Sequence, residues 1–118
     1  MPAPFIHLRV HSAYSLAEST LRLKSIVALA GGDSQPAVAI TDTNNMFGAL
    51  EFSEKMRESG VQPIIGVECI IADSRGRGEV VLLAQSEAGY EALCRHNSRA
   101  LLEVEGGDDP VIRLESIA

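Results

Sequence analysis

The sequence is poor in aromatic residues and cysteine, and it contains no tryptophan. Aromatic residues make up 4% of the chain, so the interior must be filled mainly by Ile, Val, Leu and Ala. The two cysteines, Cys69 and Cys94, form neither a disulfide framework nor a Cys-x-x-Cys metal site. Each lies in an apolar stretch, and we expect both to be small buried hydrophobic residues.

Long apolar runs and an excess of basic residues are also absent. No run approaches the roughly 20 apolar residues that cross a bilayer, and residues 1–4 lack the features of a secretion signal. We therefore expect a cytoplasmic protein without membrane contact. The chain has 10 Lys and Arg against 16 Asp and Glu, a net charge of −6. This is the wrong sign for gripping nucleic acid by phosphate neutralisation.

Short β-branched runs alternate with segments of helical periodicity. The expected strands are residues 5–11, 37–41, 63–71 and 80–84. The expected helices are a first one that is capped at Ser19 or Thr20 and stops at residues 31–32, followed by 47–59 and 86–102. Residues 103–118 are ambiguous. This alternation predicts an α/β fold with a largely parallel sheet. A closed (β/α) barrel needs about 250 residues, so a barrel would make this chain a fragment, whereas an open sheet would fit its length.

Polar side chains lie at the carboxyl ends of three expected strands. In the first strand, alternation places His7, Arg9 and His11 on one face. Asp42 follows the second strand, and Glu68 lies in the third. Because parallel strands end at one edge of a sheet, these groups are expected to meet there. Histidine and carboxylate together suit zinc, manganese or iron.

Each candidate also has a structural explanation. A single histidine at a strand end is commonly a hydrogen-bonding structural residue. Asp42 followed by Asn44 is typical of a turn or a helix cap. Glu68 interrupts an apolar run, where an unpaired buried carboxylate costs several kcal/mol, so it needs a cation or donors. Residue types alone leave a metal site and a structural role both open.

Three linked motifs resemble the PHP domain of bacterial DNA polymerase III alpha subunits. The similar segments are residues 5–16, 39–49 and 63–68, followed by 82–84 and 89–93. Their order and spacing agree over about residues 5–102. The resemblance implies an α/β fold that is a partial (β/α) barrel of the PHP type, with mostly parallel strands, truncated. Residues 1–118 are interpreted as the N-terminal portion of a single, incomplete PHP domain, with the polymerase domains absent.

The resemblance implies metal ions at the strand ends, where they would activate water. The implied ligands are His11, Glu68, His7 and Asp42. An intact PHP opening has a His-x-His pair, and Arg9 stands in the first of these positions. Thr43 likewise replaces the histidine of a Thr-Asp-His motif. Arg9 cannot ligate a metal and is permanently charged, so we expect it to neutralise Glu68 or Asp42 in place of an ion.

This degenerate site predicts no catalytic residue and no cofactor in these 118 residues. At most, weak Zn, Mn or Mg binding is expected in the parent domain. We interpret the chain as a non-catalytic scaffold within the polymerase and expect DNA contact only through the parent protein. The implied partners are the other domains of the alpha subunit and a separate proofreading exonuclease subunit. An incomplete barrel exposes a strand edge and apolar surface, so we also expect self-association.

Two other functions remain open. One is a metal-dependent phosphoesterase or 3′–5′ exonuclease of the PHP type, which requires His11 and Glu68 to hold metal with help from further residues. The other is a free-standing α/β phosphatase or binding module unrelated to replication. The linked motifs at residues 8–12 and 42–48 argue against this last interpretation.

Overall fold

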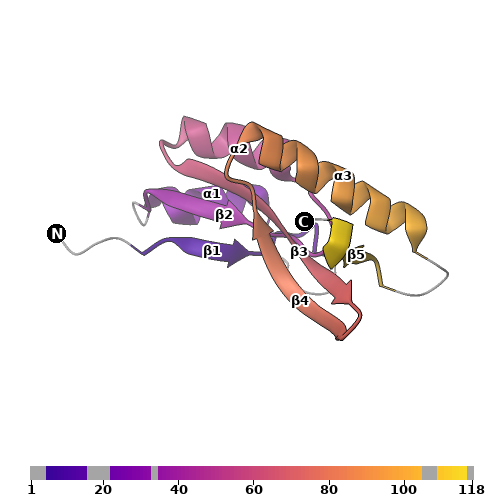
Figure 1. The fold of residues 1–118 in the computed structure, drawn as a ribbon. Coiled ribbons are helices and arrows are strands. Elements are labelled where there is room, and N and C mark those ends of the chain that lie inside the picture. The colour runs from indigo at the N-terminus through magenta and orange to yellow at the C-terminus, as the bar shows by residue number, and fades with distance from the viewer. Residues whose placement is uncertain (1–4, 16–21, 33–34, 105–108, 117–118) are drawn as a thin grey trace.

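The computed structural model describes residues 5–15, 22–32, 35–104 and 109–116. The expected helix cap at Ser19 or Thr20 lies outside these residues. Strands and helices alternate along this part of the chain, except that β4 follows β3 directly (Figure 1). The elements are β1 (His7–Val10), α1 (Leu23–Gly32), β2 (Ala37–Ile40), α2 (Ala49–Glu58), β3 (Gln62–Asp73), β4 (Gly76–Leu83), α3 (Glu87–Glu103), β5 (Val111–Arg113) and a 3₁₀ helix (Leu114–Ser116). Among the described helices, none combines the length and apolar character needed to span a bilayer.

The long strand β3 organises the sheet. It pairs in parallel with β2 and with β5, while β4 returns beside it as an antiparallel hairpin strand. β1 continues the sheet by pairing in parallel with β2. The sheet curls into part of a barrel. This confirms the predicted α/β fold, a partial barrel with mostly parallel strands, and β5 arises from the part of the sequence that was ambiguous.

Gly66 is required where β3 meets β4. β3 pairs with β2 through residues 62–65 and with β4 through residues 66–73. A Cβ atom on Gly66 would lie 2.5 Å from the carbonyl oxygen of Leu82 and 2.7 Å from Cδ2 of Leu83. No side chain fits in that space, so glycine is what allows β4 to approach β3 at this point.

Two apolar clusters of different size stabilise the fold. The larger one lies between β2, α1 and α2, and its buried members are Leu23, Ile26, Val27, Ala30, Val38, Ile40, Phe52, Met56 and Val61. The smaller one joins β3 and β5 to α3 through Cys69, Ala100 and Ile112. Because buried apolar area supplies most of the folding free energy, the half built on β1 and β2 is expected to be the more stable.

The sequence had suggested strict alternation along β1, and the structure departs from it. His7 pairs with Val38 and Val10 pairs with Ile40, so three steps along β1 match two steps along β2. Val38 and Ile40 both belong to the larger apolar cluster, and Val10 packs against it. The irregularity in register inserts one extra residue in β1 between His7 and Val10, so the expected strict alternation of this strand is interrupted.

The two cysteines differ in environment. Cys69 is 4% exposed, as expected for a small buried hydrophobic residue. Cys94 lies on α3 and is only half-buried, so the expectation of full burial is wrong for this residue. Burial and, to a smaller extent, the neighbouring Glu68 carboxylate raise the pKa of the Cys69 thiol from 9.0 to about 11.

The raised pKa of Cys69 predicts a difference in thiol reactivity. Only the thiolate reacts, so at pH 8 we expect iodoacetamide to modify Cys94 at least ~10-fold faster than Cys69 in the folded protein. Peptide mass spectrometry would measure both rates, which should converge in urea. Equal rates in native buffer would contradict the prediction.

The raised pKa also makes the free energy of unfolding depend on pH. Because the folded state holds the Cys69 proton up to about pH 11, the contribution of the protonated Cys69 thiol to stability is complete below pH 9 and declines between pH 9 and 11.

Candidate functional site

Glu68 is the centre of a polar cluster where β1 and β2 end beside β3. Its side chain is 9% exposed. The Arg9 guanidinium forms an ion pair with Oε1 of Glu68. His11 Nε2 lies 2.7 Å from Oε2, and Thr43 Oγ1 donates a hydrogen bond of 3.4 Å to the same oxygen. Both oxygens of the carboxylate are thus engaged by neighbouring segments of the chain.

The loop after β2 positions Thr43 beside Glu68 by extending the parallel pairing. The Glu68 amide donates to the carbonyl oxygen of Asp42 at 3.0 Å, and the Asn44 amide donates to the carbonyl oxygen of Glu68 at 2.8 Å. Asn44 has a φ of 57°, a left-handed conformation that asparagine tolerates better than most residues. The turn then leads the chain away from β3 toward α2.

The Asp42 carboxylate joins the loop after β1 to the loop after β2. Asp42 is 2% exposed. It accepts hydrogen bonds from the amide of Ser12 at 2.6 Å, from Ser12 Oγ at 2.6 Å and from Ser15 Oγ at 2.7 Å. Ser15 Oγ in turn accepts a hydrogen bond from the Thr43 amide at 2.9 Å. Buried carboxylates need such donors, and the structural explanation of Asp42 accounts for this geometry.

Sequence analysis missed the roles of Ser12 and Ser15. The available signal was the pair of hydroxyl residues directly after the first strand, opposite an aspartate directly after the second. A buried aspartate without a nearby cation requires hydroxyl or amide donors, and parallel strands bring these two loops together.

The structure brings only some of the predicted residues together. Arg9, His11, Thr43 and Glu68 form one cluster. His7 lies apart from it, paired with Val38 and in an edge-to-face contact with Phe5 at 4.7 Å between ring centroids. Within the described ranges, no group of three or more His, Cys, Asp or Glu side chains is arranged to hold a metal ion. The ligand set His11, Glu68, His7 and Asp42 stays a prediction.

The residues present do not fit a divalent ion, because a guanidinium takes the place beside the carboxylate. Arg9 contacts one oxygen of Glu68, where a metal would have to bind. A cation 4 Å from another unit charge is opposed by about 4 kcal/mol per charge at an effective dielectric constant of about 20. The Arg9 side chain is 63% exposed, so solvent lowers this opposition without removing it.

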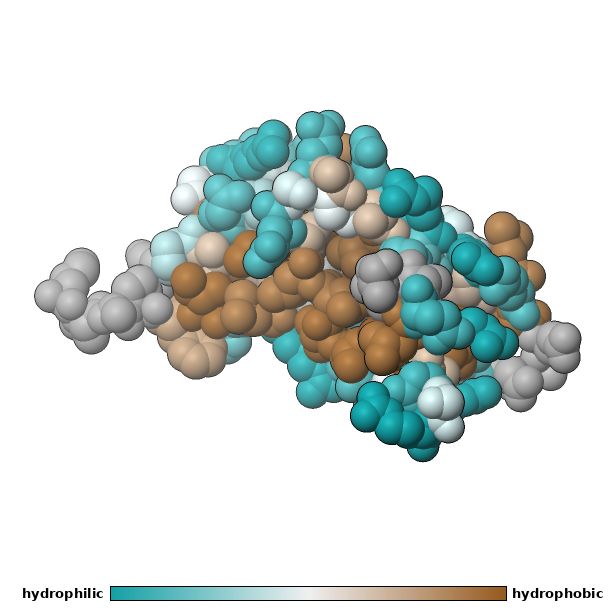
Figure 2. Space-filling model, viewed as in Figure 1, coloured by the Kyte–Doolittle hydropathy of each residue, from teal (hydrophilic) through white to brown (hydrophobic). Residues whose placement is uncertain are grey.

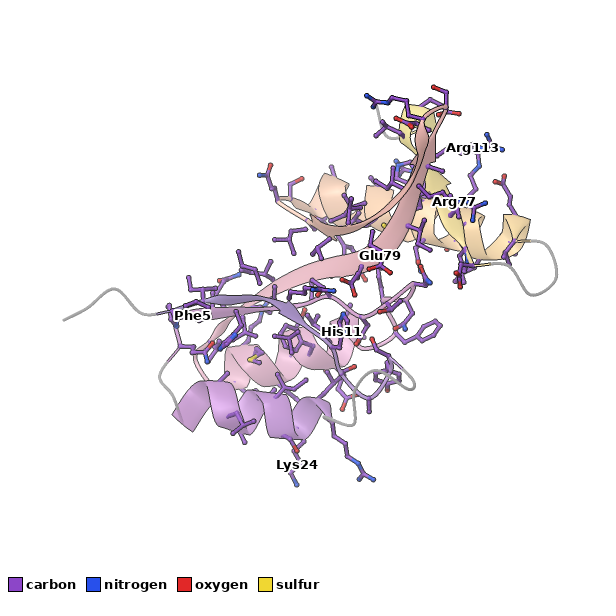
Figure 3. The ribbon with its side chains drawn as sticks, turned by 90° about the horizontal axis from the view of Figure 1, so that it is seen from below. Phe5, His11, Lys24, Arg77, Glu79 and Arg113 are labelled. Carbon is purple, nitrogen blue, oxygen red and sulfur yellow. The ribbon has the colours of Figure 1, made fainter. Side chains whose placement is uncertain are left out.

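A hollow of about 350 Å³ lies beside the cluster. Besides Arg9, His11, Thr43 and Glu68, its lining includes two acidic residues that sequence analysis missed, Glu79 of β4 and Asp109 before β5. Figure 3 shows His11 and Glu79 in the middle of the molecule, whereas Arg77 and Arg113 lie toward the far end of the sheet. Three of the nine residues that line the hollow are acidic, and Arg9 is the permanently charged cation among them.

Comparison with known proteins gives matches in both sequence and fold. A family model described as the PHP domain matches residues 7–117. DNA polymerase III subunit alpha of Caulobacter vibrioides is 38% identical over 122 residues, which cover 97% of this chain and 11% of that protein. An error-prone DNA polymerase of Symbiobacterium thermophilum is 41% identical over 91 residues, covering 77% of this chain and 8% of that protein. The chain thus spans about a tenth of the length of these relatives.

A solved structure supports the fold. An amidohydrolase from Chromobacterium violaceum superposes with a TM-score of 0.65 at 23% identity, covering 80% of this chain and 32% of that one. At this identity the likeness concerns the fold alone, and it agrees with the curled sheet of this chain.

Proposed function

Because this chain belongs to the PHP domain family, we propose that it serves as a non-catalytic scaffold within the alpha subunit of a bacterial DNA polymerase III. Family membership confirms the resemblance found in residues 5–16, 39–49 and 63–68. The similarity to the Caulobacter vibrioides alpha subunit extends over 97% of the chain and supports the polymerase assignment. DNA synthesis is then the work of other domains of that subunit, and the protein acts in the cytoplasm.

The Arg9–Glu68 ion pair is the observation that supports a non-catalytic role. Arg9 supplies a permanent positive charge at the carboxylate that anchors the cluster. It performs the electrostatic role of an ion without offering a ligand or an activated water. The cluster then serves to fasten the ends of three strands, which gives neighbouring domains and a proofreading exonuclease subunit a rigid surface on which to dock.

Metal analysis of the full-length subunit tests this proposal. After dialysis against zinc or manganese followed by metal-free buffer, we expect less than about 0.1 ion per chain, because Arg9 opposes a cation at Glu68. The Arg9→His/Thr43→His double variant restores both histidines and should gain at least ~10-fold tighter zinc or manganese binding, as imidazole is a ligand for both metals. Isothermal titration calorimetry would measure it.

An Arg77→His variant provides the control, because it makes the same arginine-to-histidine exchange on an exposed part of β4. It should gain no comparable site. Stoichiometric zinc or manganese in the unaltered subunit would contradict the scaffold role, as would a double variant that binds no better than the control.

The alternative function, a metal-dependent phosphoesterase or 3′–5′ exonuclease, draws support from one feature. His11 and Glu68 share the hollow with Glu79 and Asp109, so potential oxygen and nitrogen ligands are near. Manganese-stimulated release of 3′-terminal nucleotides by the full-length protein, lost on His11→Ala, would favour this alternative over the scaffold.

A further inference from the structure

Exposed apolar side chains gather at one corner of the molecule. The chain has three Phe, two Tyr and no Trp, yet two of these few rings lie at the surface beside each other. Tyr14 is 43% exposed and Phe47 is 69% exposed, and their rings meet edge to face with centroids 6.4 Å apart. Leu50, at the start of α2, is 71% exposed. We call Tyr14, Phe47 and Leu50 the aromatic corner.

The backbone beneath the aromatic corner is held firmly. Asn45 is 7% exposed, and its Nδ2 donates to the carbonyl oxygens of Tyr14 at 3.0 Å and Thr43 at 3.1 Å. Its Oδ1 accepts from the Phe47 amide at 3.3 Å. The Tyr14 ring packs on Gly48, where a Cβ atom would lie 3.2 Å from Tyr14 Cδ2. Rigid, exposed aromatic groups lose little entropy on binding and are typical of interface hot spots.

The outward face of α2 continues this surface with charged residues, among which three glutamates outnumber the exposed Arg57. Ala49, Phe52 and Met56 face the core, and the opposite side of the helix is exposed and carries Leu50, Glu51, Glu54, Arg57 and Glu58. Figure 2 shows the outer side of α2 as hydrophilic. α2 has 10 residues, so at 1.5 Å per residue it is about 15 Å long, which is just under three helical turns.

We propose that the aromatic corner and the glutamates of α2 form a docking surface for a basic amphipathic helix of a partner protein. Apolar residues of that helix pack against Tyr14, Phe47 and Leu50, and its Lys and Arg side chains pair with Glu51, Glu54 and Glu58. Helix-on-helix packing suits the convex outer face of α2. This inference deepens the scaffold role and rests on it, because it names where and what the scaffold binds.

The excess of glutamate on the exposed face of α2 disfavours the other occupants. Single-stranded nucleic acid could stack on the two rings, but its phosphates would lie beside three glutamates and one exposed arginine, Arg57. A second copy of this chain, joined symmetrically through α2, would bring together two faces on which glutamates outnumber the exposed arginine, and like charges repel. A basic partner is the one that matches this excess.

A binding experiment with a defined probe tests the docking surface. The probe is a fluorescein-labelled synthetic 18-residue helix with Leu at positions i, i+3, i+4 and i+7 and Lys elsewhere, titrated with the full-length protein and read by fluorescence anisotropy. Phe47→Ser and Leu50→Ser should each weaken binding at least ~10-fold, the loss typical of a truncated hot-spot residue. Leu102→Ser is the control, because Leu102 is 85% exposed on α3 and its change should leave binding unaltered.

The charge of the docking surface and the identity of the molecule that binds there can each be tested separately. Glu51→Gln/Glu54→Gln leaves the apolar anchors in place and should weaken binding about 3-fold or more, an effect that added salt should remove. A peptide with Glu in place of Lys should bind weakly. Equal losses for Leu50→Ser and Leu102→Ser would overturn the proposal, as would displacement by a thymidine oligonucleotide or self-association abolished by Phe47→Ser. If the docking proposal failed, the result of the metal analysis would be unaffected, so the docking surface and the non-catalytic scaffold role are tested separately.

Discussion

Asp42→Ala is expected to lower the free energy of unfolding by about 3–5 kcal/mol, because it removes the acceptor of three buried donors. The Asp42 carboxylate receives hydrogen bonds from the amide and Oγ of Ser12 and from Oγ of Ser15. Ser12 is fully buried and Ser15 is 2% exposed, so water cannot replace the lost acceptor without opening both loops. Urea denaturation followed by circular dichroism would measure the loss.

Two further variants separate the hydrogen-bonding role of Asp42 from the simple loss of a negative charge. Glu54→Ala removes an exposed carboxylate from α2 and should change stability by no more than about 0.5 kcal/mol. Asp42→Asn keeps the shape but turns one acceptor into a donor, so we expect an intermediate loss of about 2 kcal/mol. If Asp42→Ala lowered the free energy of unfolding only when zinc or manganese is present, that result would instead identify Asp42 as a metal ligand.

The sequence predicted the strands and helices whose periodicity is local. The buried members of α1, Leu23, Ile26, Val27 and Ala30, follow the helical spacing seen in the sequence, and β2 is the short apolar run at residues 37–40. The irregular register of β1 was not predictable, because it depends on how that strand aligns with β2. Likewise, β5 is only three residues long, and it exists because β3 offers it a parallel partner.

The sequence also indicated which residues could form the polar cluster, but not which of them contact one another. It indicated that Arg9 neutralises either Glu68 or Asp42, and the structure pairs Arg9 with Glu68. Asp42 instead accepts hydrogen bonds from serines, a choice set by how the loops after β1 and β2 pack. Glu79 reaches the hollow because β4 folds back along β3. Such contacts depend on long-range pairing, which local patterns do not encode.

Gly66→Ala is expected to lower the free energy of unfolding by at least about 3 kcal/mol, through a clash that the chain cannot relieve by rotating a side chain. The new Cβ would lie 2.5 Å from the Leu82 carbonyl oxygen, and that oxygen belongs to the backbone of the paired strand. Relief requires β4 to move away from β3. This would weaken the smaller apolar cluster, to which Val80 and Leu82 of β4 contribute.

Hydrogen exchange would locate the damage that Gly66→Ala causes. We expect faster exchange in β4 and in the residue 66–73 part of β3, while the amides of β2 keep their protection because the larger cluster contains no residue of β4. Gly78→Ala is the matched control: it lies in the same hairpin, its Cβ would have no heavy atom within 4 Å, and its effect should stay within about 1 kcal/mol. Equal losses for the two variants would mean that glycine flexibility, rather than the close approach of β4, explains Gly66.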